Sequence, residues 1–205
     1  MPKIAADDRI SAAGRAAQDL GAAALFGGNV FARVGMHPAL RAVSKPRERG
    51  QVVNAAWRRY GAVNSVSLLS ILAGWGVARI DEASDAMLSE RERRLARAKD
   101  AAVGAVAVTG IASAVVGMRF AHMEPDGAVK LADGSTPSSH TPPGEARAKR
   151  ALDAIGAAHT VASGALVALN SALSQSNFRR PPTRRLLRRD YRLRPRLPWA
   201  GAGTS

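Results

Sequence analysis

The chain of 205 residues contains no cysteine, which excludes disulfides, thiolate nucleophiles and cysteine-based metal sites. Its four histidines lie on different segments without the spacing of a metal-binding helix. The glycine pairs lack the strand, lysine and helix of a phosphate loop, and no Gly-x-Ser-x-Gly nucleophile motif is present. We therefore expect no metal and no cofactor.

Bulky side chains are also scarce, because aromatic residues make up only 4% of the chain while alanine and glycine are abundant. A water-soluble core would be short of filling material, whereas small residues suit close helix packing in lipid. The first 19 residues mix acids with bases and lack a continuous apolar segment, so we expect no cleaved signal peptide. The mean hydropathy of −0.10 conceals a strong segregation of charged and apolar stretches.

Acidic residues are outnumbered by basic ones, 16 to 30, and the formal net charge is +14. The basic residues gather in connectors and in the C-terminal tail, which leaves long uncharged stretches between them. The longest is 154–178, and a helix of this length crosses a hydrocarbon core of about 30 Å at about 1.5 Å per residue. We interpret it as a membrane span.

Three further stretches repeat the pattern at 20–40, 60–78 and 101–118. The first is the weakest, because it contains Arg33 and is otherwise short enough for a buried helix of a soluble protein. Pro38 is expected to mark its end. The sequence thus predicts an all-α fold, a four-transmembrane-helix antiparallel bundle over 1–178 followed by a basic tail over 179–205.

The tail predicts the orientation, because arginines near the end of a span favour the cytoplasmic side. Candidate contacts to anionic lipid head groups are Arg179, Arg180, Arg184, Arg185, Arg188 and Arg189. We expect a multi-pass plasma-membrane protein with both termini in the cytoplasm. The connector 41–59 is then external although it is basic, which conflicts with the same rule. The connector 119–150 is rich in Gly, Pro, Ser and Thr and should have little regular structure.

Polar residues within or next to the spans are candidates for a functional site. They are Arg33, His37, Asn54, Trp57, Arg58, Asn64, His159 and Asn170. One interpretation is a polar pocket inside the bundle, with His159 as a proton carrier or ligand and Arg33 as an anion contact. The other is hydrogen bonding between helices, at about 1 kcal/mol per contact. The second is favoured because no carboxylate lies inside an uncharged span.

The stretch GAAALFGGNVFARVGMHPALRAV leads from a glycine-rich helix to His37, and Asn54, Trp57 and Arg58 precede the second span. In this layout the chain resembles the small four-helix membrane proteins grouped with anthrone oxygenases. The resemblance implies cofactor-free oxidation of a polycyclic aromatic substrate, with these four residues as the positions to test. The long loop and the arginine tail depart from the family pattern.

Three classes of function remain open. The first, which we favour, is a structural or accessory subunit that packs against other membrane proteins or a second copy through small-residue faces. The second is a small membrane enzyme or carrier with a polar pocket inside the bundle. The third is a soluble basic nucleic-acid binder that uses the tail, although a topology signal explains arginines directly after a span more simply.

Overall fold

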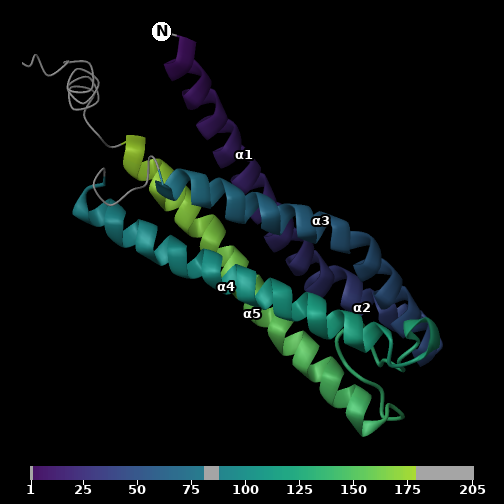
Figure 1. Cartoon of the computed structure of the whole chain (residues 1–205). Coiled ribbons are helices and arrows are strands. Elements are labelled where there is room, and N and C mark those ends of the chain that lie inside the picture. The colour runs from purple at the N-terminus through teal and green to yellow at the C-terminus, as the bar shows by residue number, and fades with distance from the viewer. Residues whose placement is uncertain (1, 81–87, 179–205) are drawn as a thin grey trace, which may run out of the picture.

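The computed structural model describes residues 2–80 and 88–178, and four long helices make up most of them (Figure 1). They are α1 (Pro2–Phe31), α3 (Pro46–Ile80), α4 (Glu90–Ala121) and α5 (Pro143–Phe178). Short helical turns join them: the π-helix η1 (Ala32–Met36), α2 (His37–Ala39), and the 3₁₀ turns η2 (Leu40–Ala42) and η3 (Pro125–Gly127). The prediction of an all-α protein is confirmed for the described residues.

The last three of the four predicted spans each lie inside a longer helix, whereas the stretch 20–40 runs from α1 through η1 and α2 into η2. Three helices, α3, α4 and α5, are long and apolar enough to cross a membrane, and they contain the predicted spans 60–78, 101–118 and 154–178. Helix α1 does not meet that criterion, so the structure does not confirm the span 20–40 as a fourth. The tail 179–205, with its six candidate head-group arginines, lies outside the described residues.

The helices associate in two antiparallel pairs, α1 with α3 and α4 with α5, and α1 also packs across α5. The main core contains mostly small and aliphatic side chains, among them Leu25, Ile71, Val106 and Leu166. Trp75 is the one aromatic residue in this buried cluster. A core of this composition lets helix backbones come close together, as small residues at interfaces allow.

The α1–α3 contact has a seven-residue repeat on both helices. A Cβ added to Gly21 would lie 2.8 Å from the Ser67 carbonyl oxygen, and one added to Gly74 would lie 2.6 Å from the Gly14 carbonyl oxygen. Seven residues after Gly21, Gly28 lies directly against the Tyr60 ring, whose hydroxyl donates to the Ala24 carbonyl at 2.8 Å. Successive contacts thus advance by two turns on each helix; at Gly21 and Gly74 backbone meets backbone, and at Gly28 the backbone of α1 meets a side chain.

The chain continues helically past the expected end of its first segment. The π-helical turn Ala32–Met36 follows α1, and Pro38 occupies the first turn of α2, where a missing amide hydrogen does no harm. The helical segment ends at Ala42, so the prediction that Pro38 marks the end is wrong by four residues. A π-helical turn adds a residue per turn and changes the direction in which the following side chains point.

The long connector between α4 and α5 has little regular structure, as predicted, yet it is packed. It forms one isolated bridge, Leu131 with Pro137, besides η3. Val129 and Leu131 are completely buried in a second apolar cluster with Leu40, Val53 and Phe120. We call residues 122–142 the capping loop, because they close this end of the helices (Figure 1).

Candidate functional site

The candidate residues gather mainly at the end of the molecule that the capping loop covers. Helix α2 supplies His37, η1 supplies Arg33, and the first four turns of α3 supply Asn54, Trp57 and Arg58. Helix α3 begins at Pro46, earlier than the span it contains, and this extension brings the three residues into the site. Gly50, although glycine is common in turns, lies within the helix.

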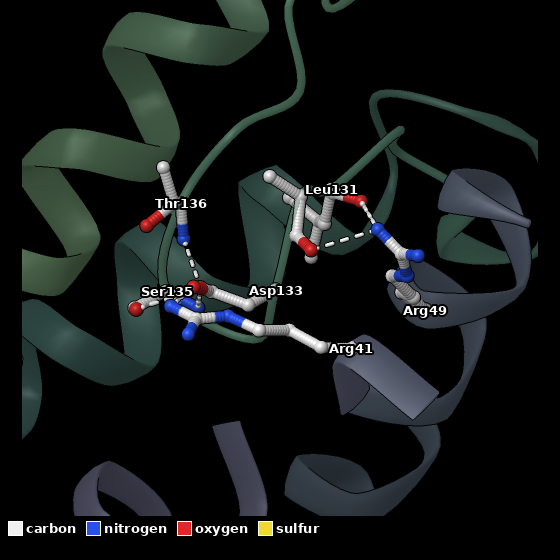
Figure 2. A network of polar contacts seen from close by, with 7 residues as sticks. Arg41, Arg49, Leu131, Asp133, Ser135 and Thr136 are labelled. Carbon is white, nitrogen blue, oxygen red and sulfur yellow. Dashed lines mark hydrogen bonds and ion pairs between the residues drawn. The ribbon is translucent and has the colours of Figure 1, made fainter. Parts of the chain in front are cut away.

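Two arginines fasten the capping loop to the helices (Figure 2). Arg49 of α3 donates to the carbonyl of Ala132 at 2.7 Å and, back along its own connector, to that of Val43 at 2.7 Å. Arg41 of η2 donates to the Asp133 carboxylate at 2.9 Å. Bonds of a charged donor to carbonyl and carboxylate oxygens are stronger than neutral ones.

Asp133 is the centre of this arrangement and is 5% exposed. Its Oδ1 accepts from the backbone N–H groups of Ser135 and Thr136, both at 2.8 Å, while Oδ2 accepts from Arg41. Burial alone would raise the pKa of this carboxyl, but the hydrogen bonds favour the charged form and hold the pKa well below its usual range. The carboxylate therefore shapes the turn and holds it to η2.

Backbone contacts complete the attachment. The N–H of Leu131 donates to the Pro46 carbonyl at 3.0 Å, and the N–H of Gly134 donates to the His37 carbonyl at 3.1 Å. A Cβ on Gly50 would lie 2.1 Å from the Val129 carbonyl oxygen, so the loop backbone rests on α3. The capping loop is thus held by side chains and main chain together.

His37 is the most enclosed of the candidates at the end that the capping loop covers. It is 7% exposed, and neither ring nitrogen has a hydrogen-bond partner among the described residues. Its ring meets Trp57 edge-on at a centroid distance of 6.3 Å, and Trp57 meets Tyr60 in the same way at 6.2 Å. Gly134 lies so close to the ring that a Cβ there would come within 2.5 Å of it.

Charged groups from α5 face the same region. Arg33 donates to the Asp153 carbonyl at 2.6 Å, and its guanidinium lies 3.6 Å from the Asp153 carboxylate. Lys149, one turn before Asp153, is 3% exposed and approaches the ring of Phe120 at 5.9 Å. Sequence reasoning missed Lys149. It lies on the same helical face as His159, because positions 159, 156, 152 and 149 are three or four residues apart.

The remaining candidates do not join this group. His159 is 5% exposed and shares a 2.8 Å hydrogen bond with Thr109 of α4. Asn170 donates to the Asp19 carboxylate at 2.8 Å, near the opposite end of the helices. Asn64 lies midway along α3, and its buried carbonyl oxygen has no partner within the described ranges. His159 and Asn170 therefore have their hydrogen-bond partners on different helices, α4 and α1.

A second cluster of charged and polar side chains lies at the opposite end of the helices. Asp100 of α4 accepts from the indole N–H of Trp75 at 2.8 Å and from Arg79 at 3.2 Å. Lys99 lies 4.0 Å from the centroid of the Trp75 ring and 3.3 Å from the Gln18 side-chain oxygen. The polar contacts at the two ends therefore bracket the apolar middle of the helices.

Within the part of the chain that the structure describes, no group of three or more His, Cys, Asp or Glu side chains is placed to hold a metal ion. No family model, no curated protein and no solved structure matches the chain. The resemblance to anthrone oxygenases, with His37, Asn54, Trp57 and Arg58 as its positions, therefore stays a prediction.

Proposed function

We propose that the chain is a multi-pass plasma-membrane protein whose helices serve a structural or accessory role, packing against other membrane helices. The observation that carries this proposal is the spacing of its charged ends. From Asp100 to Arg119, helix α4 rises about 28 Å at about 1.5 Å per residue, close to the thickness of a hydrocarbon core. Large apolar side chains such as Val108, Ile111 and Met118 are exposed between these limits.

The amount of exposed apolar surface supports the same conclusion. In both α4 and α5, only 17% of the most apolar 18-residue stretch is buried within the chain. Soluble monomers rarely expose contiguous apolar patches of this extent, whereas lipid or neighbouring helices would cover them without cost.

The contacts of α1 argue for its placement in the bilayer beside α3. Gly14, Gly21 and Gly28 face α3 between Gly74 and Tyr60, which is the uncharged part of that helix. If α3 crosses the membrane, α1 accompanies it, which gives four spans and places both termini on the cytoplasmic side.

The conflict over the basic connector 41–59 also has an explanation on this proposal. Arg41 and Arg49 are engaged by Asp133 and by loop carbonyls, so they serve to hold the capping loop. The capping loop then faces the outside, and the arginine tail, with its expected contacts to anionic head groups, faces the cytoplasm.

The test combines an alkaline wash of membranes with labelling of single cysteines by an impermeant thiol reagent. The natural chain has no cysteine, so positions 44 and 139 at the capped end, 91 at the other end and 11 near the N-terminus can be substituted one at a time. The proposal predicts retention in the membrane, with labelling from outside only at 44 and 139. Release by the wash would instead support the soluble, nucleic-acid-binding alternative.

One observation favours a second candidate, a small membrane enzyme or carrier. His37 is buried beside Trp57 with both ring nitrogens unpaired among the described residues, and buried polar groups without partners are uncommon. Substituting His37 by Phe separates the two functions. Loss of a cellular activity with the bundle still folded supports the enzyme or carrier, whereas an unchanged phenotype supports the accessory role.

A further inference from the structure

An open pocket lies beside the capping loop, where α3 begins and α4 ends. Its volume is about 530 Å³, within the usual range for small-ligand sites. Asn54 and Arg58 of α3 form one wall, and the chain from Ala121 to Gly127 forms the other. The pocket is distinct from the enclosed surroundings of His37.

The wall of this pocket depends on Gly127. This residue has a φ of +65°, in the left-handed region that favours glycine. A Cβ at this position would also lie 2.0 Å from the amide nitrogen of Asn54. Conformation and close contact both require glycine here, and the Asn54 amide is thereby held against the backbone of η3.

The depth of the pocket follows from the limits of the uncharged stretches. Arg58 lies two residues before Tyr60, where the uncharged part of α3 begins. Ala121 lies three residues after Met118, where the uncharged part of α4 ends. Both positions lie within about 5 Å of the apolar zone along the helix axis. The interfacial layer on each side of a bilayer is about 5 to 8 Å thick. In the proposed membrane placement, the pocket is therefore level with the lipid head groups.

The lining presents groups of both signs. Arg58 offers a guanidinium, which suits a phosphate, and Asn54 offers an amide beside it. The Met118 carbonyl accepts from Nδ1 of His122 at 2.7 Å, so Nε2 is the ring nitrogen left for a further hydrogen bond. Glu124 adds a carboxylate.

A second carboxyl stands behind Glu124. Glu145, in the first turn of α5 and well before the uncharged stretch, is its hydrogen-bonding neighbour. Burial raises the pKa of Glu145, and the adjacent Glu124 carboxylate raises it further. The charge of Lys130, a residue of the capping loop, lowers the pKa of Glu145 in part, so one cation of the chain already lies near this acidic pair.

We propose that this pocket binds the head group of a phospholipid that carries a primary amine, such as phosphatidylethanolamine. The inference rests on the proposed membrane placement. Arg58 and Asn54 hold the phosphate, while Glu124 and the Nε2 atom of His122 accept hydrogen bonds from the ammonium group. The acyl chains continue along the exposed apolar side chains of α4, which include Val115 and Met118.

The experiment measures lipids bound to the full-length protein by native mass spectrometry. Protein in detergent is mixed with equal amounts of phosphatidylethanolamine, phosphatidylcholine and phosphatidylglycerol with identical acyl chains. We expect about tenfold preference for the ethanolamine lipid, because a hydrogen bond to a charged group contributes about one factor of ten and the trimethylated amine cannot donate one. Equal binding of the three lipids would overturn the proposal.

Matched variants assign the preference to this pocket. Glu124→Gln should abolish the preference for ethanolamine over choline, and Arg58→Gln should lower the binding of the ethanolamine lipid about tenfold. Arg59→Gln is the control, because Arg59 is an exposed neighbour that does not line the pocket. Equal losses in Arg58→Gln and Arg59→Gln would show a general effect of surface charge and overturn the proposal. Circular dichroism melting confirms that each variant is folded.

Two further measurements separate this proposal from its alternatives. Soluble phosphoethanolamine should not displace the lipid at equal concentration, because it lacks acyl chains; complete displacement would reassign the pocket to a soluble ligand. The alkaline wash tests membrane placement independently. Retention in the membrane together with unselective lipid binding would refute only the head-group site, whereas release by the wash would refute the membrane placement itself.

Discussion

The α1–α3 contact and the capping loop show two different ways of holding the same chain together. In the α1–α3 contact, glycines let backbones touch, as at Gly21 and Ser67, and few hydrogen bonds cross between the helices. In the capping loop, Arg49 and Asp133 satisfy backbone groups that lack regular secondary structure. Close packing suffices in the helices, because their backbone N–H and C=O groups already bond to one another. In an irregular loop, charged side chains supply hydrogen bonds to the backbone groups that have no such partners.

The largest effect should come from filling the α1–α3 contact. Gly21→Leu places a side chain where even a Cβ would lie 2.8 Å from the Ser67 carbonyl, so α1 must move away from α3. Overpacking of this kind costs about 1 to 3 kcal/mol or more. We expect a clear fall in the melting temperature in detergent.

The matched control is Gly27→Leu, six residues further along the same helix. Nothing lies within 4 Å of a Cβ at Gly27, and leucine is a better helix former than glycine. This variant should be as stable as the natural protein or slightly more stable. Equal destabilisation by both substitutions would refute the described register of α1 on α3.

Loosening the capping loop should have the next largest effect. Arg49→Ala removes the hydrogen bonds to the carbonyls of Val43 and Ala132. A hydrogen bond to a charged group contributes about 1.5 to 3 kcal/mol to stability. We expect faster amide hydrogen exchange at 128–137 with little change in the middle of the helices. Arg47→Ala, at an exposed neighbouring arginine, should leave the exchange rates unchanged.

A smaller and pH-dependent effect is expected at Asp133. Because its pKa is lowered in the folded state, its charged form stabilises the loop fully above its ordinary value of 3.8, and this stabilisation is lost as the pH falls through the lower folded value. Asp133→Asn should lower loop protection at pH 7, and the difference from the natural protein should shrink below about pH 4. A difference that stayed constant down to pH 2 would contradict this role.

The smallest effect should come from the polar contact between α4 and α5. Thr109→Val removes the hydrogen bond to His159, and contacts of this kind between membrane helices average about 0.6 kcal/mol. We expect a shift of the melting temperature of a few degrees at most and no loss of cellular function. A large functional loss without destabilisation would instead make His159 part of a working site.

The helices themselves could be predicted from the sequence, and the contacts at their ends could not. The uncharged stretches 60–78, 101–118 and 154–178 identified three helices, since helix formation depends on local composition. The seven-residue spacing of Gly14, Gly21 and Gly28 is a visible signal for the α1–α3 contact, which the uncharged stretches alone do not reveal.

The candidate site was predicted in part. His37 and Trp57 were named as positions to test and do come together, because α2 and the first turns of α3 are close in the sequence. His159 and Asn170 share a face of α5 but bind different helices, at Thr109 of α4 and Asp19 of α1, since periodicity gives the face of a residue and not its partner. Glu124 and His122 were missed because loop residues carry no periodic signal.

By itself, the sequence determined that the chain forms long apolar helices with charged ends, because the absence of charge over about 20 residues and the abundance of alanine and glycine act locally. Only the tertiary structure decided which charged groups meet. Arg33 reaches Asp153 across 120 residues of sequence, and Asn170 reaches Asp19 across 151. Such pairings depend on the register and crossing of whole helices, which no local pattern specifies.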